Sequence, residues 1–204
     1  MTAARTMWTG LAARAARGPL GARAREGRDA DLLGAVLAGL RGDERVLDLG
    51  AGTGRLTLPV AARLRNGLVV AVDLSDDMLA ELRREARERG LDPVIEVRRA
   101  DAAATGLPSA SMDLVFSAGL LHEVPDPAAV LREVRRVLKP EGRLLLKDFR
   151  HGPLFGPLLR LVHPRGAAGP LRPAALEELL ARVELREASV REAGSRHLVA
   201  EARR

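Results

Sequence analysis

The chain alternates between short apolar runs and longer segments whose apolar residues recur every three or four positions. The short runs predict buried strands over residues 46–49, 68–72, 94–100, 112–117 and 143–148. The longer segments predict helices over residues 29–40, 55–64, 76–89, 128–138 and 173–183. Strands that alternate with helices are typical of a mainly parallel sheet covered by helices, so the pattern predicts an α/β fold.

Two C-terminal segments depart from this alternation. Residues 149–173 contain five prolines and four glycines around an apolar centre, and a loop of this length in a compact domain is usually functional. After the last predicted helix, two short runs joined by Ala193-Gly194-Ser195 predict a closing β-hairpin over residues 184–202.

A glycine-rich turn connects the first predicted strand to its helix. Gly50, Gly52 and Gly54 stand at alternate positions after residues 46–49, where a backbone without side chains lets a ligand approach the start of a helix. The spacing differs by one residue from the G-x-G-x-x-G turn that binds dinucleotides. Asp48 would repel a pyrophosphate but suits a ligand that carries an ammonium or sulfonium group. The turn predicts a nucleotide-type cofactor site, and the alternative is a loop that only packs helix on strand.

Acidic residues at the ends of the next two strands fit an adenosine. Asp73 ends the second strand, where dinucleotide-binding folds place the acid that binds the ribose hydroxyls. The alternative role for Asp73 is to help cap the next helix, which Ser75 or Asp76 could do unaided. Asp101, at the end of the third strand, is placed to accept a hydrogen bond from an adenine amino group, or else it is an ordinary surface-loop acid.

The composition describes one globular domain. Its 204 residues are 47% hydrophobic and 29% charged, and this length is enough for a sizeable core. No apolar run approaches the roughly 20 residues that cross a bilayer, so no transmembrane segment is expected. The absence of cysteine excludes disulfides and thiolate chemistry and is compatible with the cytoplasm, where we expect the protein to be.

The positive charge is concentrated near the N-terminus. Residues 1–28 hold six arginines and one acidic residue, so they carry +5 of the net charge of +6. The stretch lacks serine and is interrupted by Gly18-Pro19, which favours a basic, partly helical arm over residues 1–42 rather than a cleaved transit peptide. The remainder is nearly neutral and poor in aromatic side chains, so no nucleic-acid partner is expected.

The most specific motifs lie in the second half of the predicted sheet. They are Asp113-Leu114-Val115, Leu121-His122 and the run over residues 130–144. Together with the glycine turn, they resemble the class I S-adenosylmethionine-dependent methyltransferases, in the small-molecule group similar to the ubiquinone/menaquinone C-methyltransferases. Glu141 stands where the usual Leu-Lys-Pro-Gly-Gly turn has its first glycine. The resemblance implies a Rossmann-like seven-stranded sheet, parallel except for its last strand, with helices on both faces, in a single methyltransferase domain over residues 43–204.

The resemblance also implies which residues hold S-adenosylmethionine. The methionine part would lie at the glycine turn and at the backbone of the fourth strand's end, against Asp48, Gly50, Ala51, Gly52, Gly54 and Ser117. Asp73 and Leu74 would hold the ribose, and Asp101 and Ala102 the adenine. Residues 149–173 would cover the substrate.

Methyl transfer from a sulfonium is an in-line displacement, which needs placement and, for a protonated nucleophile, a base. His122 is the candidate base because it follows the fourth strand, where the substrate should enter; alternatively it orients that loop or caps the next helix. Asp148 and His151, at the end of the fifth strand, are further catalytic candidates on the substrate side. No group of histidines and acids has metal-ligand spacing, so no metal is expected.

The expected acceptor is a small molecule. Residues 117–120 stand where enzymes that methylate base amino groups carry an Asn/Asp-Pro-Pro-aromatic motif, and methylation of cytosine C5 or arsenite needs a cysteine. The predicted function is S-adenosylmethionine-dependent methyl transfer, with the oligomeric state open. The alternatives are a protein that binds S-adenosylmethionine without turnover and an NAD-dependent oxidoreductase, which the glycine spacing and the motifs of residues 113–144 disfavour.

Overall fold

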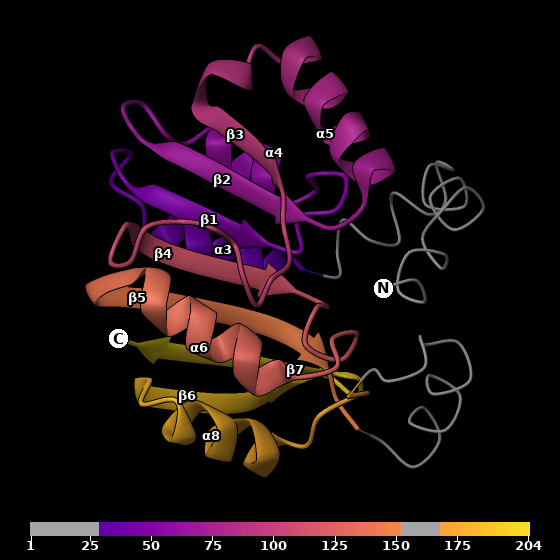
Figure 1. The fold of residues 1–204 in the computed structure, drawn as a ribbon, viewed down its shortest axis with the longest axis vertical. Coiled ribbons are helices and arrows are strands. Elements are labelled where there is room, and N and C mark those ends of the chain that lie inside the picture. The colour runs from indigo at the N-terminus through magenta and orange to yellow at the C-terminus, as the bar shows by residue number, and fades with distance from the viewer. Residues whose placement is uncertain (1–28, 152–167) are drawn as a thin grey trace.

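A seven-stranded sheet forms the centre of the molecule (Figure 1). The computed structural model describes residues 29–151 and 168–204. The strands are β1 (Arg45–Leu49), β2 (Leu68–Asp73), β3 (Ile95–Arg99), β4 (Met112–Ala118), β5 (Leu138–Phe149), β6 (Arg186–Ala193) and β7 (His197–Arg203). They lie in the order β3-β2-β1-β4-β5-β7-β6, and β7 runs antiparallel to both of its neighbours while β1 to β5 pair in parallel. The sheet expected from the sequence is therefore confirmed.

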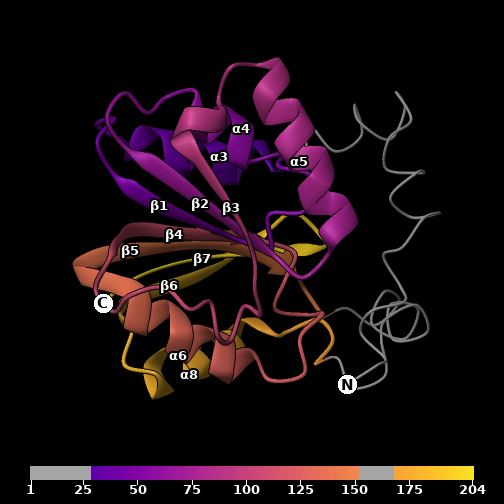
Figure 2. The same ribbon diagram turned by 45° about the horizontal axis from the view of Figure 1, so that its top comes forward.

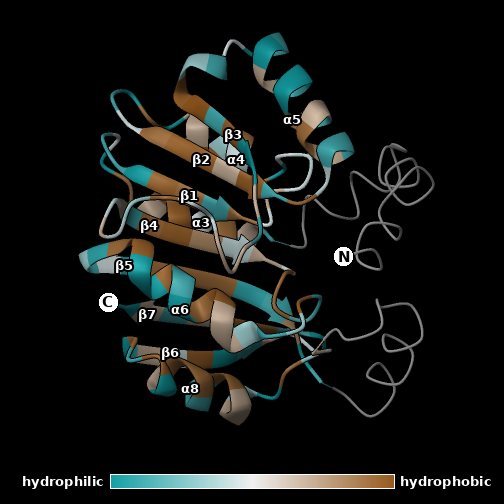
Figure 3. Cartoon of the chain, in the orientation of Figure 1, coloured by the Kyte–Doolittle hydropathy of each residue, from teal (hydrophilic) through white to brown (hydrophobic). Residues whose placement is uncertain are grey.

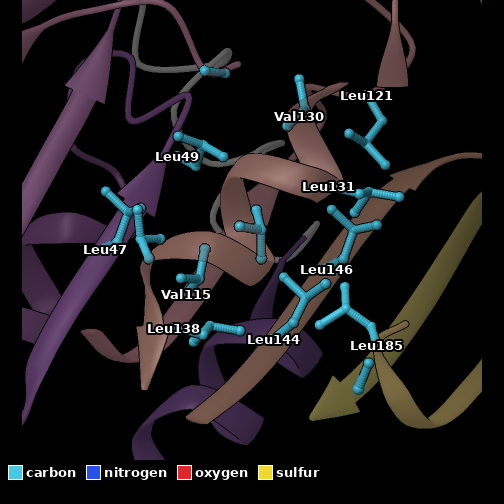
Figure 4. Packing of buried hydrophobic residues seen from close by; sticks show 14 of the residues in the cluster. Leu47, Leu49, Val115, Leu121, Val130, Leu131, Leu138, Leu144, Leu146 and Leu185 are labelled. Carbon is cyan, nitrogen blue, oxygen red and sulfur yellow. The ribbon is translucent and has the colours of Figure 1, made fainter. Parts of the chain in front are cut away.

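Helices cover both faces of the sheet (Figure 2). One face carries α3 (Ala30–Ala38), α4 (Thr57–Ala61) and α5 (Asp76–Glu88), and the other carries α6 (Pro127–Val137) and α8 (Pro173–Arg182). A short 3₁₀ turn, η1 (Asp92–Val94), precedes β3. Each face buries its own apolar cluster, and Figure 4 shows the one beneath α6, where Leu131 lies beside Leu146 of β5.

Side chains of the central strands alternate between the two apolar clusters. Leu144 and Leu146 of β5 belong to the cluster beneath α6 and α8, whereas Leu145 belongs to the cluster beneath α3, α4 and α5. Continued to the end of β5, the alternation points Lys147 toward the α3 face and Asp148 toward the α6 face. A strand buried on both faces reads as a continuous apolar run, which is why its sequence predicts a strand directly.

Local sequence signals explain where the longer helices begin and end. Asp126 caps α6 by accepting a hydrogen bond from the Ala129 N–H at 3.1 Å, and proline takes the first helical position. Gly90 stops α5 with a φ of 66°, in the left-handed region that glycine adopts at little cost. The buried positions of α5 are Leu79, Leu82 and Ala86, and its outer surface is hydrophilic (Figure 3).

The helix after the glycine turn is shorter than the sequence predicts. The helical pattern extends over residues 55–64, but the helix spans only Thr57–Ala61. Beyond it the Arg63 N–H donates to the Val60 carbonyl at 3.0 Å, a tighter three-residue turn, and the Arg65 N–H donates to the Gly42 carbonyl at 2.8 Å. Attachment to the segment before β1 therefore ends the helix, and a periodic pattern carries no sign of such a contact.

The fifth strand begins earlier than predicted. It starts at Leu138, which pairs with Met112, and not at Arg143. The register shifts between Met112 and Leu114, because the turn with Glu141 lies within the strand. The residues of this turn have low strand propensity, so only the pairing of Leu138 with Met112 of β4 reveals the extension.

The strand order reverses beside the end of β1, which is where open α/β sheets bind their ligands. The chain passes from β1 to β2 on one side, while β4 pairs with β1 on the other. Ligands of open α/β sheets bind outside the carboxyl ends of the strands, at the point where the strand order reverses. The glycine turn after β1 and the segment after β4 meet at this edge.

Candidate active site

The glycine loop between β1 and α4 folds back over the end of β2. The N–H groups of Gly50 and Ala51 donate to the Val72 carbonyl at 2.9 and 3.0 Å, and the Gly54 N–H donates to the Ala51 carbonyl at 2.9 Å. The φ angles of Gly50, Gly52 and Gly54 are 80°, 54° and 84°. Residues with a Cβ adopt such angles only at a cost, so all three positions favour glycine.

The three glycines have different surroundings. A Cβ on Gly54 would overlap Leu82 of α5, and one on Gly50 would lie 3.2 Å from Leu120. Among the described residues, a Cβ on Gly52 would meet only the Met78 sulfur, at 3.4 Å. Gly54 therefore allows close packing of the loop on α5, whereas Gly52 is where the loop is most open to a ligand.

Asp48 lies beneath the loop. Only 3% of its surface is exposed, and its Oδ2 accepts a hydrogen bond from the Thr57 hydroxyl at 2.6 Å. Burial raises the pKa of Asp48 to about 7, against the hydrogen bond from Thr57, which lowers it. A carboxyl that ionises near neutral pH responds to a nearby ligand cation, since positive charge favours the carboxylate.

Asp73 joins the glycine loop to the start of α5. Its Oδ2 accepts a hydrogen bond from the Gly52 N–H at 2.8 Å, and its Oδ1 accepts one from the Ser75 N–H at 2.9 Å. Ser75 caps α5, because its hydroxyl accepts the Met78 N–H at 3.4 Å. The side chain of Asp73 is thus not the helix cap, and each of its oxygens has a second lone pair that can accept a hydroxyl.

The residues predicted to contact the adenosine lie at neighbouring strand ends. Asp73 pairs with Arg99 of β3, so Leu74 and Asp101 follow adjacent strands. Leu74 is 53% exposed, and no other large hydrophobic side chain within residues 29–151 and 168–204 is exposed. Asp101 is exposed and its Oδ1 accepts the Ala103 N–H at 2.8 Å, whereas Ala102 is buried.

Ser117 lies at the end of β4, directly beside the end of β1. Its side chain is buried, and its hydroxyl donates to the Leu49 carbonyl at 2.6 Å. This bond holds β4 against the start of the glycine loop. The side chain of Ser117 is therefore engaged within the sheet, while its backbone lies beside the end of β1, where the strand order reverses.

His122 and Asp148 form a buried pair where β4 and β5 end. The distance from His122 Nδ1 to Asp148 Oδ1 is 2.6 Å, and the two residues are 2% and 1% exposed. Asp148 Oδ2 also accepts the Leu121 N–H at 2.6 Å. The ring of Phe149 packs edge-on against the imidazole, with 4.8 Å between centroids. These contacts fix the orientation of the histidine.

The environment of His122 sets its protonation. Burial lowers the pKa of His122, but the hydrogen bond and charge of Asp148, with the charge of Glu123, outweigh it and hold the pKa above its ordinary value. Because the Asp148 carboxylate is an acceptor, we assign the proton of the neutral ring to Nδ1. Nε2, 3.6 Å from a Glu123 carboxylate oxygen, is then the nitrogen that accepts a further proton.

His151 lies beyond Phe149 and lines a cavity of its own. The cavity has a volume of about 550 Å³, and its lining is Arg150, His151, Arg172, Pro173, Ala174 and Glu192. The backbone N–H of His151 donates to the Leu171 carbonyl at 2.9 Å. The catalytic candidates from the sequence therefore separate into the His122–Asp148 pair and this cavity. Most of the predicted covering segment and of the basic arm, residues 152–167 and 1–28, lies outside the described residues.

Sequence reasoning missed a group of charges on the opposite face of β5. Lys147 is 4% exposed, and its Nζ lies 2.5 Å from Asp31 and 3.9 Å from Asp29, at the start of α3. Asp29 also pairs with Arg55, next to the glycine loop. The sequence did contain a signal for this group, because Lys147 stands between Leu146 and Asp148 in a predicted buried strand. A lysine in such a strand needs an acidic partner, since an unpaired lysine does not remain buried.

The described part of the chain contains neither a metal-binding cluster nor a membrane-spanning helix. Across residues 29–151 and 168–204, no three or more histidine or acidic side chains are grouped so that they could hold a metal ion. Within the same ranges, no helix is both long and apolar enough to cross a membrane.

Residues 47–146 match the family model described as a methyltransferase domain. The ubiquinone/menaquinone biosynthesis C-methyltransferase UbiE of Proteus mirabilis is 37% identical over 125 residues, which cover 61% of this chain and 49% of that protein. The phosphatidylethanolamine N-methyltransferase of Cereibacter sphaeroides is 35% identical over 140 residues, 69% of this chain and 60% of that protein. The chain thus spans about half the length of the curated relatives it matches.

Solved structures share the fold. A structure of a SAM-dependent methyltransferase from Aquifex aeolicus aligns with a TM-score of 0.70 at 23% identity, over 91% of this chain and 98% of that one. The likeness therefore extends over nearly the whole sheet, including strands outside the residues of the family match.

Proposed function

We propose that this chain, which by family is a class I S-adenosylmethionine-dependent methyltransferase, transfers a methyl group from S-adenosylmethionine to a small-molecule acceptor. The observation that carries the proposal is the glycine loop, which is hydrogen-bonded to Asp73 through Gly52 and has the buried Asp48 beneath it. The glycine spacing and the match over residues 47–146 favour this cofactor over a dinucleotide.

The residues at the ends of β1 and β2 fit S-adenosylmethionine. Gly52 leaves space beside the loop, and the buried acid Asp48 is suited to a ligand with a positive charge. Asp73 supplies lone pairs for the ribose hydroxyls, and the exposed Leu74 supplies an apolar surface for the adenosine. When bound, the cofactor supplies a methyl group on a positively charged sulfur, and the acceptor's electron pair displaces that sulfur from the methyl carbon.

The chain's own contribution is placement, exclusion of water and movement of one proton. We assign the proton acceptor to His122 Nε2, which takes the proton of the acceptor's nucleophilic group. Asp148 then stabilises the imidazolium through the 2.6 Å bond to Nδ1. Because the pair is buried, the charge that forms there interacts strongly with the carboxylate.

The acceptor atom stays open in this proposal, because the named relatives are a C-methyltransferase and an N-methyltransferase. We assign residues 43–204 to the methyltransferase domain and residues 149–173 to a cover over the substrate. The arm predicted over residues 1–42 is not wholly separate from that domain, because Leu32 and Val36 of α3 are buried in the apolar cluster on one face of the sheet. The proposed cytoplasmic location depends on composition alone.

The first experiment is a calorimetric titration of the full chain with S-adenosylhomocysteine and, separately, with NAD. We expect micromolar binding of S-adenosylhomocysteine, loss of that binding in Asp73→Ala, and no binding of NAD. Asp92→Ala is the matched control, since Asp92 is an exposed acid in η1 and should leave binding unchanged. Binding of NAD alone would overturn the proposal.

A second experiment separates the enzyme from a protein that only binds the cofactor. Labelled S-adenosylmethionine is incubated with pools of small molecules and the wild-type chain or His122→Gln. Transfer by the wild type that falls in His122→Gln, at unchanged affinity for S-adenosylhomocysteine, supports a catalytic role. Binding without transfer to any pool would favour the non-catalytic alternative.

A further inference from the structure

The cavity beside His151 has an excess of positive charge. Among its lining side chains are Arg150 and Arg172, and the acid among them is Glu192, which pairs with Arg150. The Nε of Arg150 is buried and has no hydrogen-bond partner within residues 29–151 and 168–204. The guanidinium groups thus have donors that the described residues do not use.

The start of α8 adds to the positive potential. The N-cap position is Arg172, no side chain among residues 29–151 and 168–204 caps the helix, and its first turn contains no acidic residue. The positive end of a helix dipole normally attracts acids and disfavours cations. Two arginines gathered at such a helix end are unfavourable to each other and to the helix unless an anion joins them.

The arrangement is fixed by the fold. Arg150 and Leu171 form a parallel bridge, and the His151 N–H bonds to the Leu171 carbonyl at 2.9 Å. The Arg150 N–H donates to the Arg196 carbonyl at 2.8 Å, which continues the pairing of β5 with β7. The two arginines are therefore held on adjacent backbone segments.

The cavity lies near the His122–Asp148 pair. Asp148 and Arg150 are two residues apart on extended backbone, a separation of about 7 Å, and they point to the same side. An anionic group held by Arg150 would therefore lie within the length of one small molecule from His122.

We propose that Arg150 and Arg172 bind a carboxylate or phosphate group of the methyl acceptor, so that the acceptor is an anionic small molecule. This inference rests on the proposed function of the neighbouring site. Glu192 competes for Arg150, and the acceptor's anion would replace it in part. Specificity would come from this cavity, while cofactor binding depends on residues at the ends of β1 to β3.

The first arm of the test titrates the full chain with inorganic phosphate at constant ionic strength, with S-adenosylhomocysteine present. We expect saturable binding that weakens about tenfold in Arg172→Gln and strengthens in Glu192→Gln. Arg182→Gln, in the last turn of the same helix, is the matched control and should behave as the wild type. The inference would be overturned if phosphate did not bind saturably, or if Arg172→Gln and Arg182→Gln lost phosphate affinity to the same extent.

Affinity for S-adenosylhomocysteine distinguishes the proposed function from the proposed anion site. It also shows whether each variant is folded, because only a folded chain binds this ligand. It should be the same in the wild type, Arg172→Gln and Glu192→Gln. If the wild type fails to bind S-adenosylhomocysteine, the proposed function is wrong. If it binds S-adenosylhomocysteine but not phosphate, only the anion site is wrong.

The second arm asks whether the anion belongs to the acceptor. Methyl transfer from labelled S-adenosylmethionine is measured with matched pairs of small acids and their neutral amides. We expect transfer to the acids, competition by phosphate against the acid but not against S-adenosylmethionine, and a kcat/KM about tenfold lower in Arg172→Gln. Equal transfer to the amides, or phosphate binding without competition, would indicate a site for free anions and overturn the assignment to the acceptor.

Discussion

Asp48 is a buried carboxyl whose ionisation a cationic ligand would change. Its pKa of about 7 means that near pH 6 it is mainly protonated, and binding of a ligand ammonium group requires loss of that proton. We therefore expect the affinity for S-adenosylhomocysteine to rise by up to about tenfold between pH 6 and pH 8. In Asp48→Asn the affinity should be lower and lack this rise. Calorimetry at several pH values checks both, and an unchanged pH dependence in the variant would contradict the role.

The His122–Asp148 pair predicts a particular pH profile for methyl transfer. The base form of His122 exists above its pKa, which Asp148 raises, so kcat/KM should increase with pH through a midpoint above the ordinary histidine value. Asp148→Asn should lower kcat by about 100-fold and move the midpoint to lower pH, because the raising charge is gone. Rates measured from pH 5 to 9 check this. A reduced rate at an unmoved midpoint would indicate that Asp148 only stabilises the fold.

Glu141 occupies a turn within β5 and has a left-handed backbone. Its φ is 63°, where a side chain costs about 1 kcal/mol relative to glycine. Its contact with Arg186, at 3.4 Å between exposed side chains, offsets little of that cost. Glu141→Gly should therefore raise the melting temperature by roughly 2–4 °C. Glu177→Gly, within α8, is the control with the opposite sign, because glycine is unfavourable inside a helix.

Glu133 ties α6 to the loop after β3. It accepts hydrogen bonds from the hydroxyl and the N–H of Thr105, at 2.5 and 2.9 Å, and from Arg136. Burial raises the pKa of Glu133, but the bonds from Arg136 and Thr105 outweigh it and lower the pKa to about 2. A lowered pKa contributes stability above the ordinary value of 4.5, and this stability is lost as the pH falls toward 2.

Glu133→Gln should therefore be about 2 kcal/mol less stable than the wild type at pH 7, and the difference should shrink toward pH 2. Urea unfolding at a series of pH values measures this dependence. Glu177→Gln, an exposed residue of α8, is the control and should show neither effect. A difference that stays constant with pH would mean that Glu133 acts through packing and not through its charge.

The sequence predicted the elements best where their signals are local. The start of α6 at Asp126-Pro127 and the end of α5 at Gly90 follow from caps that lie within a few residues. The end of α4 did not follow, because it depends on the Gly42 carbonyl before β1. Boundaries set by distant partners leave no periodic trace in the chain.

Lys147 and Asp31 connect β5 to α3, across 116 residues of sequence. Asp31→Asn leaves the buried lysine with less opposing charge and should cost about 2 kcal/mol of unfolding free energy. Replacing Lys147 by methionine in the same chain should recover at least part of this loss, because an apolar side chain of similar length tolerates burial. Urea unfolding of both variants tests the coupling, and a double variant less stable than Asp31→Asn would contradict it.

The chain by itself determined the class of sheet, the glycine turn and the acids at the ends of β2 and β3. Each is a pattern of neighbours in sequence: alternation of apolar runs, glycines two apart, a carboxylate at a strand end. The sequence also predicted His122, Asp148 and His151 as catalytic candidates. It did not distinguish their roles, and it did not predict the distances between them.

Only the tertiary structure decided how these side chains are grouped. It pairs His122 with Asp148 at 2.6 Å, because β4 and β5 are adjacent and parallel, and it places His151, Arg150 and Arg172 around a separate cavity. It also brings Asp31 to Lys147 through the packing of α3 on the sheet. The reason is that strand order and side-chain facing join residues far apart in the chain, whereas periodicity and spacing report only on residues close together in it.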